Sequence, residues 1–221
     1  MTIETNDEQS AARFLGHLLF SYAIFVFAFV IDQTFRWTNH FDGLRSGLIQ
    51  GAILGIGWCV IYVIPWSLIF LWLHWRGKWT RSLRSYILAP SWLILIFSVA
   101  GLILWPPTAK RRFKEHAKVE MPAEISGLSY KLCGGGIADI HDTFYFRTTP
   151  QEVERLIREM GLIPEKSFSH LDSGMISQLP NAPDPRRWDG ATQFNGNEGI
   201  WFYTLLTDSS KTEVYVSVMQ I

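Results

Sequence analysis

The chain has 221 residues, of which 48% are hydrophobic and 14% aromatic, and its 20 basic and 20 acidic side chains cancel. This aromatic content excludes a disordered chain, and two cysteines are too few for a disulfide scaffold. Zero net charge without a basic domain argues against a dedicated nucleic-acid binder, so we expect no nucleic-acid partner.

The charged residues divide the chain into an apolar first part and a polar second part. Residues 1–109 contain three long segments without Asp, Glu, Lys or Arg, at 14–31, 46–75 and 85–109. At about 1.5 Å per residue, a helix over each segment can cross a hydrocarbon core of roughly 30 Å. We therefore predict a membrane domain over residues 1–109 with transmembrane helices at about 14–31, 48–73 and 86–105.

The alternative for the first segment is a cleaved signal peptide. A signal peptide begins with basic residues, whereas residues 1–13 carry three acidic residues and one arginine. We therefore expect the segment to remain as a span. Transporters and channels generally carry charged groups inside their spans, and these three segments contain no Asp, Glu, Lys or Arg. The sequence thus favours an anchor or an assembly surface.

Three glycines mark one face of the second span. Gly47, Gly51 and Gly55 are spaced by four residues, so all three lie on the same side of a helix. Small residues let another backbone approach closely, which is what drives helix association in lipid. We interpret them as a helix-packing face whose partner is the first helix, the third helix or a second copy of the chain.

A basic collar follows the third span over residues 110–118. Its cations are candidates for binding lipid headgroups, and they are Lys110, Arg111, Arg112, Lys114 and Lys118. Basic residues beside a span also mark the cytoplasmic side. We therefore expect a multi-pass protein of the cell membrane with its carboxyl-terminal domain in the cytoplasm, and the lipid bilayer as its partner.

Residues 119–221 read as a small soluble domain. Alternating or β-prone segments predict strands at 125–133, 142–148, 200–207 and 212–220, with a glycine turn at 134–136. Between the two pairs, Thr149, Pro150 and Glu152 have the pattern of a capped helix start. We predict an α+β two-layer domain, with an antiparallel sheet of about four strands and one helix, and a surface loop over 167–189.

Candidate chemistry in this domain is sparse. Asp139, His141 and Asp142 form the only cluster with acid–base or metal-ligand side chains, and a turn with exposed polar groups is the simpler interpretation. A Cys133–His141 thiol site lacks any further support. Arg186, Arg187 and Trp188 either bind a ligand or pack Trp188 onto the sheet, and packing is favoured. We expect no cofactor and no metal.

Three functional hypotheses remain. The favoured one is a non-enzymatic protein whose three spans present the α+β domain for binding or assembly at the membrane surface. The second is an accessory subunit that packs against a membrane protein, or against a second copy, through the glycine face. The third is a membrane-bound hydrolase that uses the region of Asp139, His141 and Asp142.

Overall fold

The computed structural model describes residues 4–77, 83–134, 139–165, 179 and 181–220. The chain divides into two compact units. The helical unit contains Met1–Phe35 and Phe41–Pro106, and the α+β unit contains Arg36–His40 and Pro107–Ile221. The basic collar at 110–118 therefore belongs to the α+β unit, and so does the short segment between the first two helices.

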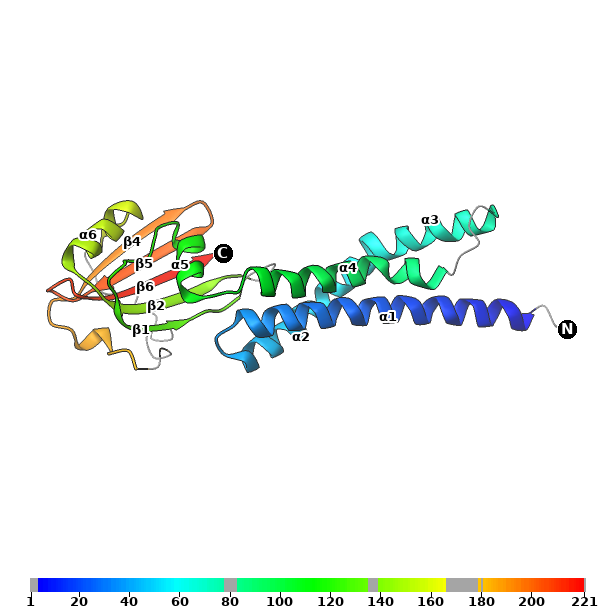
Figure 1. The fold of residues 1–221 in the computed structure, drawn as a ribbon, viewed down its shortest axis with the longest axis horizontal. Coiled ribbons are helices and arrows are strands. Elements are labelled where there is room, and N and C mark those ends of the chain that lie inside the picture. The colour runs from blue at the N-terminus through cyan, green and yellow to red at the C-terminus, as the bar shows by residue number, and fades with distance from the viewer. Residues whose placement is uncertain (1–3, 78–82, 135–138, 166–178, 180, 221) are drawn as a thin grey trace. The chain divides into compact units, whose positions relative to one another are not determined.

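The helical unit contains the apolar segments in helical conformation (Figure 1). Its elements are α1 (Glu4–Arg36), α2 (His40–Trp58), the π-helix η1 (Cys59–Val63), α3 (Ile64–Trp75) and α4 (Leu83–Leu104). Three stretches are long and apolar enough to cross a membrane, namely Leu15–Arg36, His40–Leu73 and Tyr86–Leu104. They overlap the three predicted spans, although the first extends to Arg36 and the second begins at His40.

Two prolines interrupt the helical hydrogen bonding of this unit. The π-helix precedes Pro65, and there the N–H of Ile64 donates to the Cys59 carbonyl, five residues back. Pro90 has no N–H, so the carbonyl of Tyr86 loses its helical partner. The indole of Trp66 donates to that carbonyl at 2.6 Å instead. A side chain of α3 thus satisfies the backbone group that the proline of α4 leaves open.

Ser91 connects three segments inside the helical unit. Its hydroxyl lies 2.7 Å from that of Ser21 on α1 and accepts a hydrogen bond of 3.1 Å from the indole of Trp58 on α2. Both serines are fully buried. Buried hydroxyls that bond to one another avoid the penalty for unpaired polar groups in an apolar surrounding.

The glycine face of α2 packs against α1. Gly47, Gly51 and Gly55 are buried, and a Cβ atom on Gly47 would lie 2.8 Å from the Cα of Val30. A Cβ on Gly55 would lie 2.8 Å from the ring of Tyr22, whose hydroxyl donates to the Ala52 carbonyl at 3.0 Å. The first helix is therefore the partner that the sequence left open.

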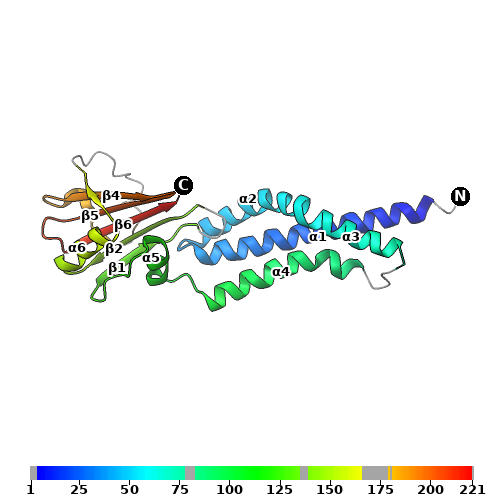
Figure 2. The same ribbon diagram turned by 90° about the horizontal axis from the view of Figure 1, so that it is seen from above.

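The α+β unit is built on a six-stranded antiparallel sheet in the order β1-β2-β6-β5-β4-β3. The strands are β1 (Ser126–Lys131), β2 (His141–Arg147), β3 (Ile163–Pro164), β4 (Thr192–Glu198), β5 (Trp201–Thr207) and β6 (Glu213–Gln220). Helices α5 (Ala109–Ala117) and α6 (Pro150–Glu159) cover one face of the sheet (Figures 1 and 2).

Each face of the sheet carries its own apolar cluster. On the helical face, Phe113 of α5 packs edge-on against Phe144 and Phe146 of β2, at ring distances of 5.1 and 6.0 Å. On the opposite face, Trp188 packs on Tyr215 at 5.7 Å. The packing interpretation of Trp188 is therefore confirmed. Residues 167–178 and 180 of the predicted loop lie outside the described residues.

The prediction of about four strands is wrong, because β3 and β4 are additional. Strand β4 has the sequence TQFNGNE, and Asn and Gly are depleted in strands. Strand β3 has two residues, one of them Pro164. The few β-prone residues in these segments, Ile163, Thr192 and Phe194, stand beside strand-depleted ones, so pairing with β5 and between β3 and β4 determines their conformation. Helix α5 was also missed, since its residues were interpreted only as a charged collar.

Helix α6 begins as its sequence predicts. The side chain of Thr149 accepts a hydrogen bond from the N–H of Glu152, and Pro150 occupies the first turn. Val153 and Leu156 are fully buried against the sheet.

At the predicted glycine turn, Gly134 has φ +77°, and a Cβ there would collide with the Asp139 carbonyl. Residues 135 and 136 lie outside the described residues.

The hairpin between β5 and β6 is held by one carboxylate. Asp208 Oδ1 accepts from the N–H groups of Thr212 and Glu213 at 2.7 and 2.9 Å, and Oδ2 accepts from Ser210. Burial alone would raise the pKa of Asp208. The hydrogen bonds from Ser210, Glu213 and Thr212 outweigh burial and leave this pKa below its ordinary value.

We expect Asp208→Asn to lower the free energy of unfolding by about 1 kcal/mol at pH 7, since the group is partly exposed to solvent. Because the pKa of Asp208 is lower in the folded state, its ionised form stabilises the fold at pH values above the unfolded-state pKa of about 3.9. This contribution is lost as the pH falls below that value. The difference between the two proteins, measured by urea unfolding, should therefore shrink below about pH 4. Asp189→Asn, at an exposed position, is the control and should have no such effect.

Candidate functional site

Helix α5 presents a cation, an aromatic ring and a histidine to the sheet. The helix begins after Thr108 and ends before Lys118, which has the left-handed φ of +59°. Arg112 and His116 are four residues apart and therefore project from the same side. Phe113 lies between them and is fully buried. The sequence RRFKEH thus encodes an amphipathic helix whose buried face includes a guanidinium.

The partner of these side chains is Asp142 on β2, whose carboxylate is fully buried. Asp142 Oδ1 accepts from Arg112 Nη2 at 2.6 Å, and Oδ2 accepts from Arg112 Nε at 2.9 Å. Oδ2 also lies 2.7 Å from His116 Nδ1, and Oδ1 accepts from the Cys133 N–H at 3.2 Å. We call Arg112, His116 and Asp142 the Asp142 cluster.

Burying a charge is costly unless it is paired and fully hydrogen-bonded. Arg112 meets this condition by binding Asp142 through two nitrogens and by donating from Nη1 to the Gly134 carbonyl at 3.0 Å. The bidentate geometry is the strong form of an arginine–carboxylate pair. Because both Asp142 oxygens accept two hydrogen bonds, the carboxylate has little capacity left to act as a general base.

His116 is oriented from two sides. An ionised carboxylate can only accept, so Nδ1 of His116 carries the proton that faces Asp142. The imidazole also stacks on the indole of Trp201 at a ring distance of 5.4 Å. The histidine therefore joins the end of α5 to β2 and β5.

The end of β1 receives contacts from two segments that are far apart in the sequence. Thr38, between α1 and α2, donates its N–H to the Leu132 carbonyl at 3.0 Å and accepts from the Leu132 N–H at 2.7 Å. The next residues, Cys133 and Gly134, bind Asp142 and Arg112. The connection between α1 and α2 and the helix that follows α4 therefore both hold residues 132–134.

The polar residues that the sequence singled out do not converge. Asp142 and His141 are neighbours in β2 and so point to opposite faces of the sheet. His141 Nε2 lies 3.4 Å from the Ser217 hydroxyl, whereas Asp139 is exposed. Only Asp142 belongs to a cluster, and its partners come from α5. The interpretation of Asp142 as part of an exposed polar turn is therefore wrong.

The five cations of the basic collar do not share one environment, although the sequence predicts that all of them bind lipid headgroups. Arg112 is buried with Asp142 and does not face lipid headgroups. The other cations are partly or fully exposed, and three of them pair locally, Arg111 with Glu115, Lys114 with Glu120 and Lys118 with Glu198. Headgroup binding by Lys110, Arg111, Lys114 and Lys118 stays a prediction. The three ion pairs reduce the positive charge that the collar can offer to a headgroup.

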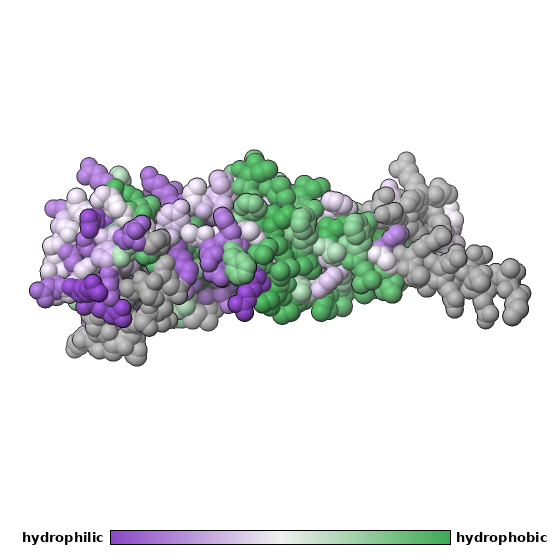
Figure 3. All heavy atoms as spheres, turned by 90° about the horizontal axis from the view of Figure 1, so that it is seen from below, coloured by the Kyte–Doolittle hydropathy of each residue, from purple (hydrophilic) through white to green (hydrophobic). Residues whose placement is uncertain are grey.

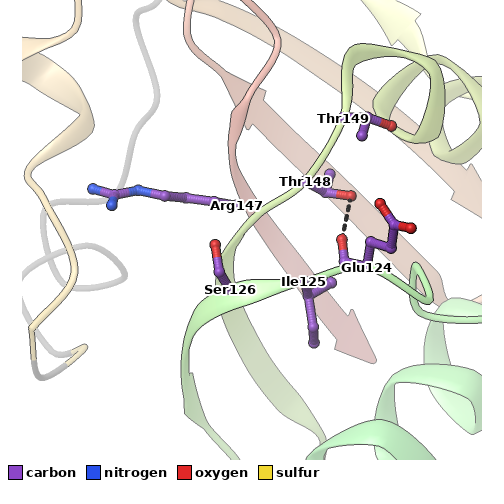
Figure 4. A pocket seen from close by; sticks show the side chains of 6 residues that line it. All are labelled: Glu124, Ile125, Ser126, Arg147, Thr148 and Thr149. Carbon is purple, nitrogen blue, oxygen red and sulfur yellow. Dashed lines mark hydrogen bonds between the residues drawn. The ribbon is translucent and has the colours of Figure 1, made fainter.

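An open pocket of about 460 Å³ lies where β1 begins and β2 ends (Figure 4). Its polar groups are largely engaged with one another or with the helix cap. The Thr148 hydroxyl donates to the Glu124 carbonyl at 2.9 Å, and Arg147 pairs with Glu213. We assign no ligand to this pocket. Its lining residues are Glu124, Ile125, Ser126, Arg147, Thr148 and Thr149.

Comparisons with protein families, with curated proteins and with solved structures found no match to this chain. Among the described residues, no group of three or more His, Cys, Asp or Glu side chains is placed to hold a metal ion. The contacts of Arg112 and His116 with Asp142 fasten α5 to the sheet. The four-residue spacing of Arg112 and His116 is compatible with one helix face, but it does not identify Asp142 as the partner of that face.

Proposed function

We propose that this chain is a multi-pass membrane protein whose three spans hold the α+β unit at the membrane surface, where that unit binds or assembles with a partner. The observation that carries the proposal is the apolar exterior of the helical unit (Figure 3). Within the most apolar windows of the second and third candidate spans, only 18% and 17% of residues are buried.

The exposed side chains are large and lie along the full candidate spans. Ile53, Phe97 and Ile103 expose 66%, 71% and 72% of their surface. Leaving such a side chain in water forgoes about 1.5–3 kcal/mol of burial free energy. Soluble monomers rarely carry contiguous apolar surface of this extent, whereas lipid tails solvate it without cost.

Two segments that follow candidate spans bind within the α+β unit. Thr38 binds Leu132 at one point of this unit, and Arg112 binds Asp142 at another. The two residues follow the first and the third candidate span. A domain whose sheet is held by both connections is suited to presenting a surface, and the saturated Asp142 carboxylate favours a non-enzymatic role over the hydrolase hypothesis.

Two finer points belong to the same proposal. The basic residues after the third span favour a cytoplasmic α+β unit. An accessory subunit would need a surface other than Gly47, Gly51 and Gly55, because α1 already fills that face.

Sedimentation tests the membrane assignment. The full-length chain is expected to remain in the membrane pellet after alkaline carbonate washing and to enter the supernatant only with detergent, because its apolar exterior needs lipid or detergent around it. A soluble cytosolic protein and a carbonate-extracted peripheral protein serve as controls. Release of the folded chain by carbonate alone would refute the assignment.

A further inference from the structure

The connection between α1 and α2 is too short to leave a bilayer surface. Thr38 lies two residues after Arg36, where the first candidate span ends, and two before His40, where the second begins. At about 3.6 Å per residue at most, its backbone stays within roughly 7 Å of both span ends. Thr38 forms two hydrogen bonds with the backbone of Leu132. In an inserted chain, the end of β1 is therefore kept beside the bilayer.

The connection after the third candidate span binds the same end of the sheet. Helix α5 begins shortly after that span. Arg112, in its first turn, donates to the Gly134 carbonyl at 3.0 Å, beside the backbone that Thr38 holds. In the last turn of the helix, His116 stacks on Trp201 at the start of β5. Helix α5 thus extends along this end of the sheet from β1 to β5.

The register of the strands carries this end across to the hairpin between β4 and β5. The Cys133 carbonyl accepts from the N–H of His141. His141 pairs with Met219, and Met219 pairs with Phe202. The start of β5 and the turn before it therefore lie at the same end of the sheet as residues 132–134.

The hairpin is apolar at this end of the sheet. Ile200, in the turn, exposes 52% of its surface, and Phe202 exposes 40%. Met219, the partner of Phe202, is partly exposed. We call Ile200, Phe202 and Met219 the apolar tip. Turns are usually built from Gly, Pro, Asn, Asp and Ser, and the turn at the other end of β5, residues 208–211, consists of Asp, Ser, Ser and Lys.

The charges near the apolar tip suit a lipid surface. Glu198, the acidic residue beside the turn, is paired with Lys118. Lys110, in the first turn of α5, is exposed and has the sign that anionic headgroups attract. Apolar side chains beside cations are what segments at a membrane interface present. Two short connections also keep the bilayer within constant reach, so its effective concentration exceeds that of a diffusing partner.

We propose that the apolar tip enters the headgroup region of the bilayer that the spans cross. The proposal rests on the proposed membrane anchoring. The α+β unit is then held to the membrane at three places, through Thr38 at β1, through α5 and through the apolar tip at β5. The third contact restricts rotation of the unit about its two connections and determines which of its surfaces faces away from the lipid.

Quenching of a fluorophore by labelled lipid tests the proposal. In a chain with both natural cysteines replaced by serine, Ile200→Cys receives a nitrobenzoxadiazole label, and the full chain is reconstituted into vesicles of phosphatidylcholine and phosphatidylglycerol. Some of the lipid carries a nitroxide near the headgroup. Ser209→Cys is the matched control, an exposed turn position at the other end of β5, a strand of roughly 23 Å. We expect at least threefold stronger quenching at position 200 than at position 209.

Second-site changes separate insertion from proximity. Phe202→Glu puts a negative charge in the apolar tip and is expected to lower the quenching at position 200 at least twofold, with the circular dichroism spectrum unchanged. Ile163→Glu is the control, because Ile163 exposes 71% of its surface and pairs with Asn195, away from the tip. It should leave the quenching unchanged. If Phe202→Glu disturbs the fold, the label is moved to Phe202→Cys and the more exposed Ile200 is changed to Glu.

Three results would overturn the proposal. They are equal quenching at positions 200 and 209, quenching that survives the charge substitution, and a label at position 200 that is shielded from both the lipid nitroxide and aqueous iodide. The last result would mean that a protein covers the apolar tip.

A label at Ile103→Cys, on a residue of α4 that exposes 72% of its surface, reports on anchoring separately. Strong lipid quenching at position 103 with none at position 200 counts against the tip contact and not against the membrane assignment. Absence of quenching at both positions counts against the membrane assignment itself.

Discussion

Asp142→Ala is expected to lower the free energy of unfolding of the α+β unit by about 3–5 kcal/mol, the cost of leaving one member of a buried ion pair alone. The substitution leaves the buried guanidinium of Arg112 without its carboxylate and also removes the acceptor of His116 and of the Cys133 N–H. Domains are stable by only about 5–15 kcal/mol. Urea unfolding of the full chain in mild detergent, followed by the β-sheet signal in circular dichroism, measures the change.

Two variants separate the ion pair from other causes. His141→Ala alters the neighbouring residue on the opposite face, whose hydrogen bond to Ser217 is long at 3.4 Å, and should cost less than about 1 kcal/mol. The double variant Arg112→Met with Asp142→Leu removes both charges and is expected to recover much of the lost stability. Equal losses for Asp142→Ala and His141→Ala would contradict the assigned role of the cluster.

The elements that could be predicted are those whose signals are local. Thr149, Pro150 and Glu152 specify the start of α6 within four residues. The sequence also predicts the final hairpin, because β5 and β6 are rich in β-prone residues and a polar turn at Asp208 separates them. The three apolar helices followed from run length alone.

The Asp142 cluster could not be predicted, because its members are distant in sequence. Arg112 and Asp142 are separated by 30 residues and His116 and Asp142 by 26. A count of charges assigns Arg112 to the collar, and only the fold reveals that it turns inward. The contact of Thr38 with Leu132 spans 94 residues, and neither residue type carries any pairing signal.

The glycine face shows a limit of a different kind. Spacing alone identifies which side of α2 is flat, but a flat side fits any helix that comes close. The choice of α1 depends on the residues opposite, such as Val30 and Phe29, which lie within contact distance of the missing Cβ atoms. No periodicity in α1 marks these residues as the partner.

Gly47→Leu is expected to separate α1 from α2. The first atom of the new side chain would lie 2.8 Å from the Cα of Val30 and 3.2 Å from the Cβ of Gln33. A backbone atom cannot rotate away as a side chain can, so the helices must move apart. We expect a loss at the upper end of, or above, the roughly 1–3 kcal/mol typical of overpacking.

Gly57→Leu is the matched control, since it adds the same side chain to the same helix at a position with no described atom within 4 Å of its Cβ. The temperature at which the detergent-solubilised chain loses its monodisperse peak in size-exclusion chromatography should fall for Gly47→Leu and stay near wild type for Gly57→Leu. Equal shifts would mean that bulk in lipid, rather than the α1 contact, explains the glycines. A lower temperature for Gly47→Leu alone would show that close packing of α1 against α2 stabilises the helical unit.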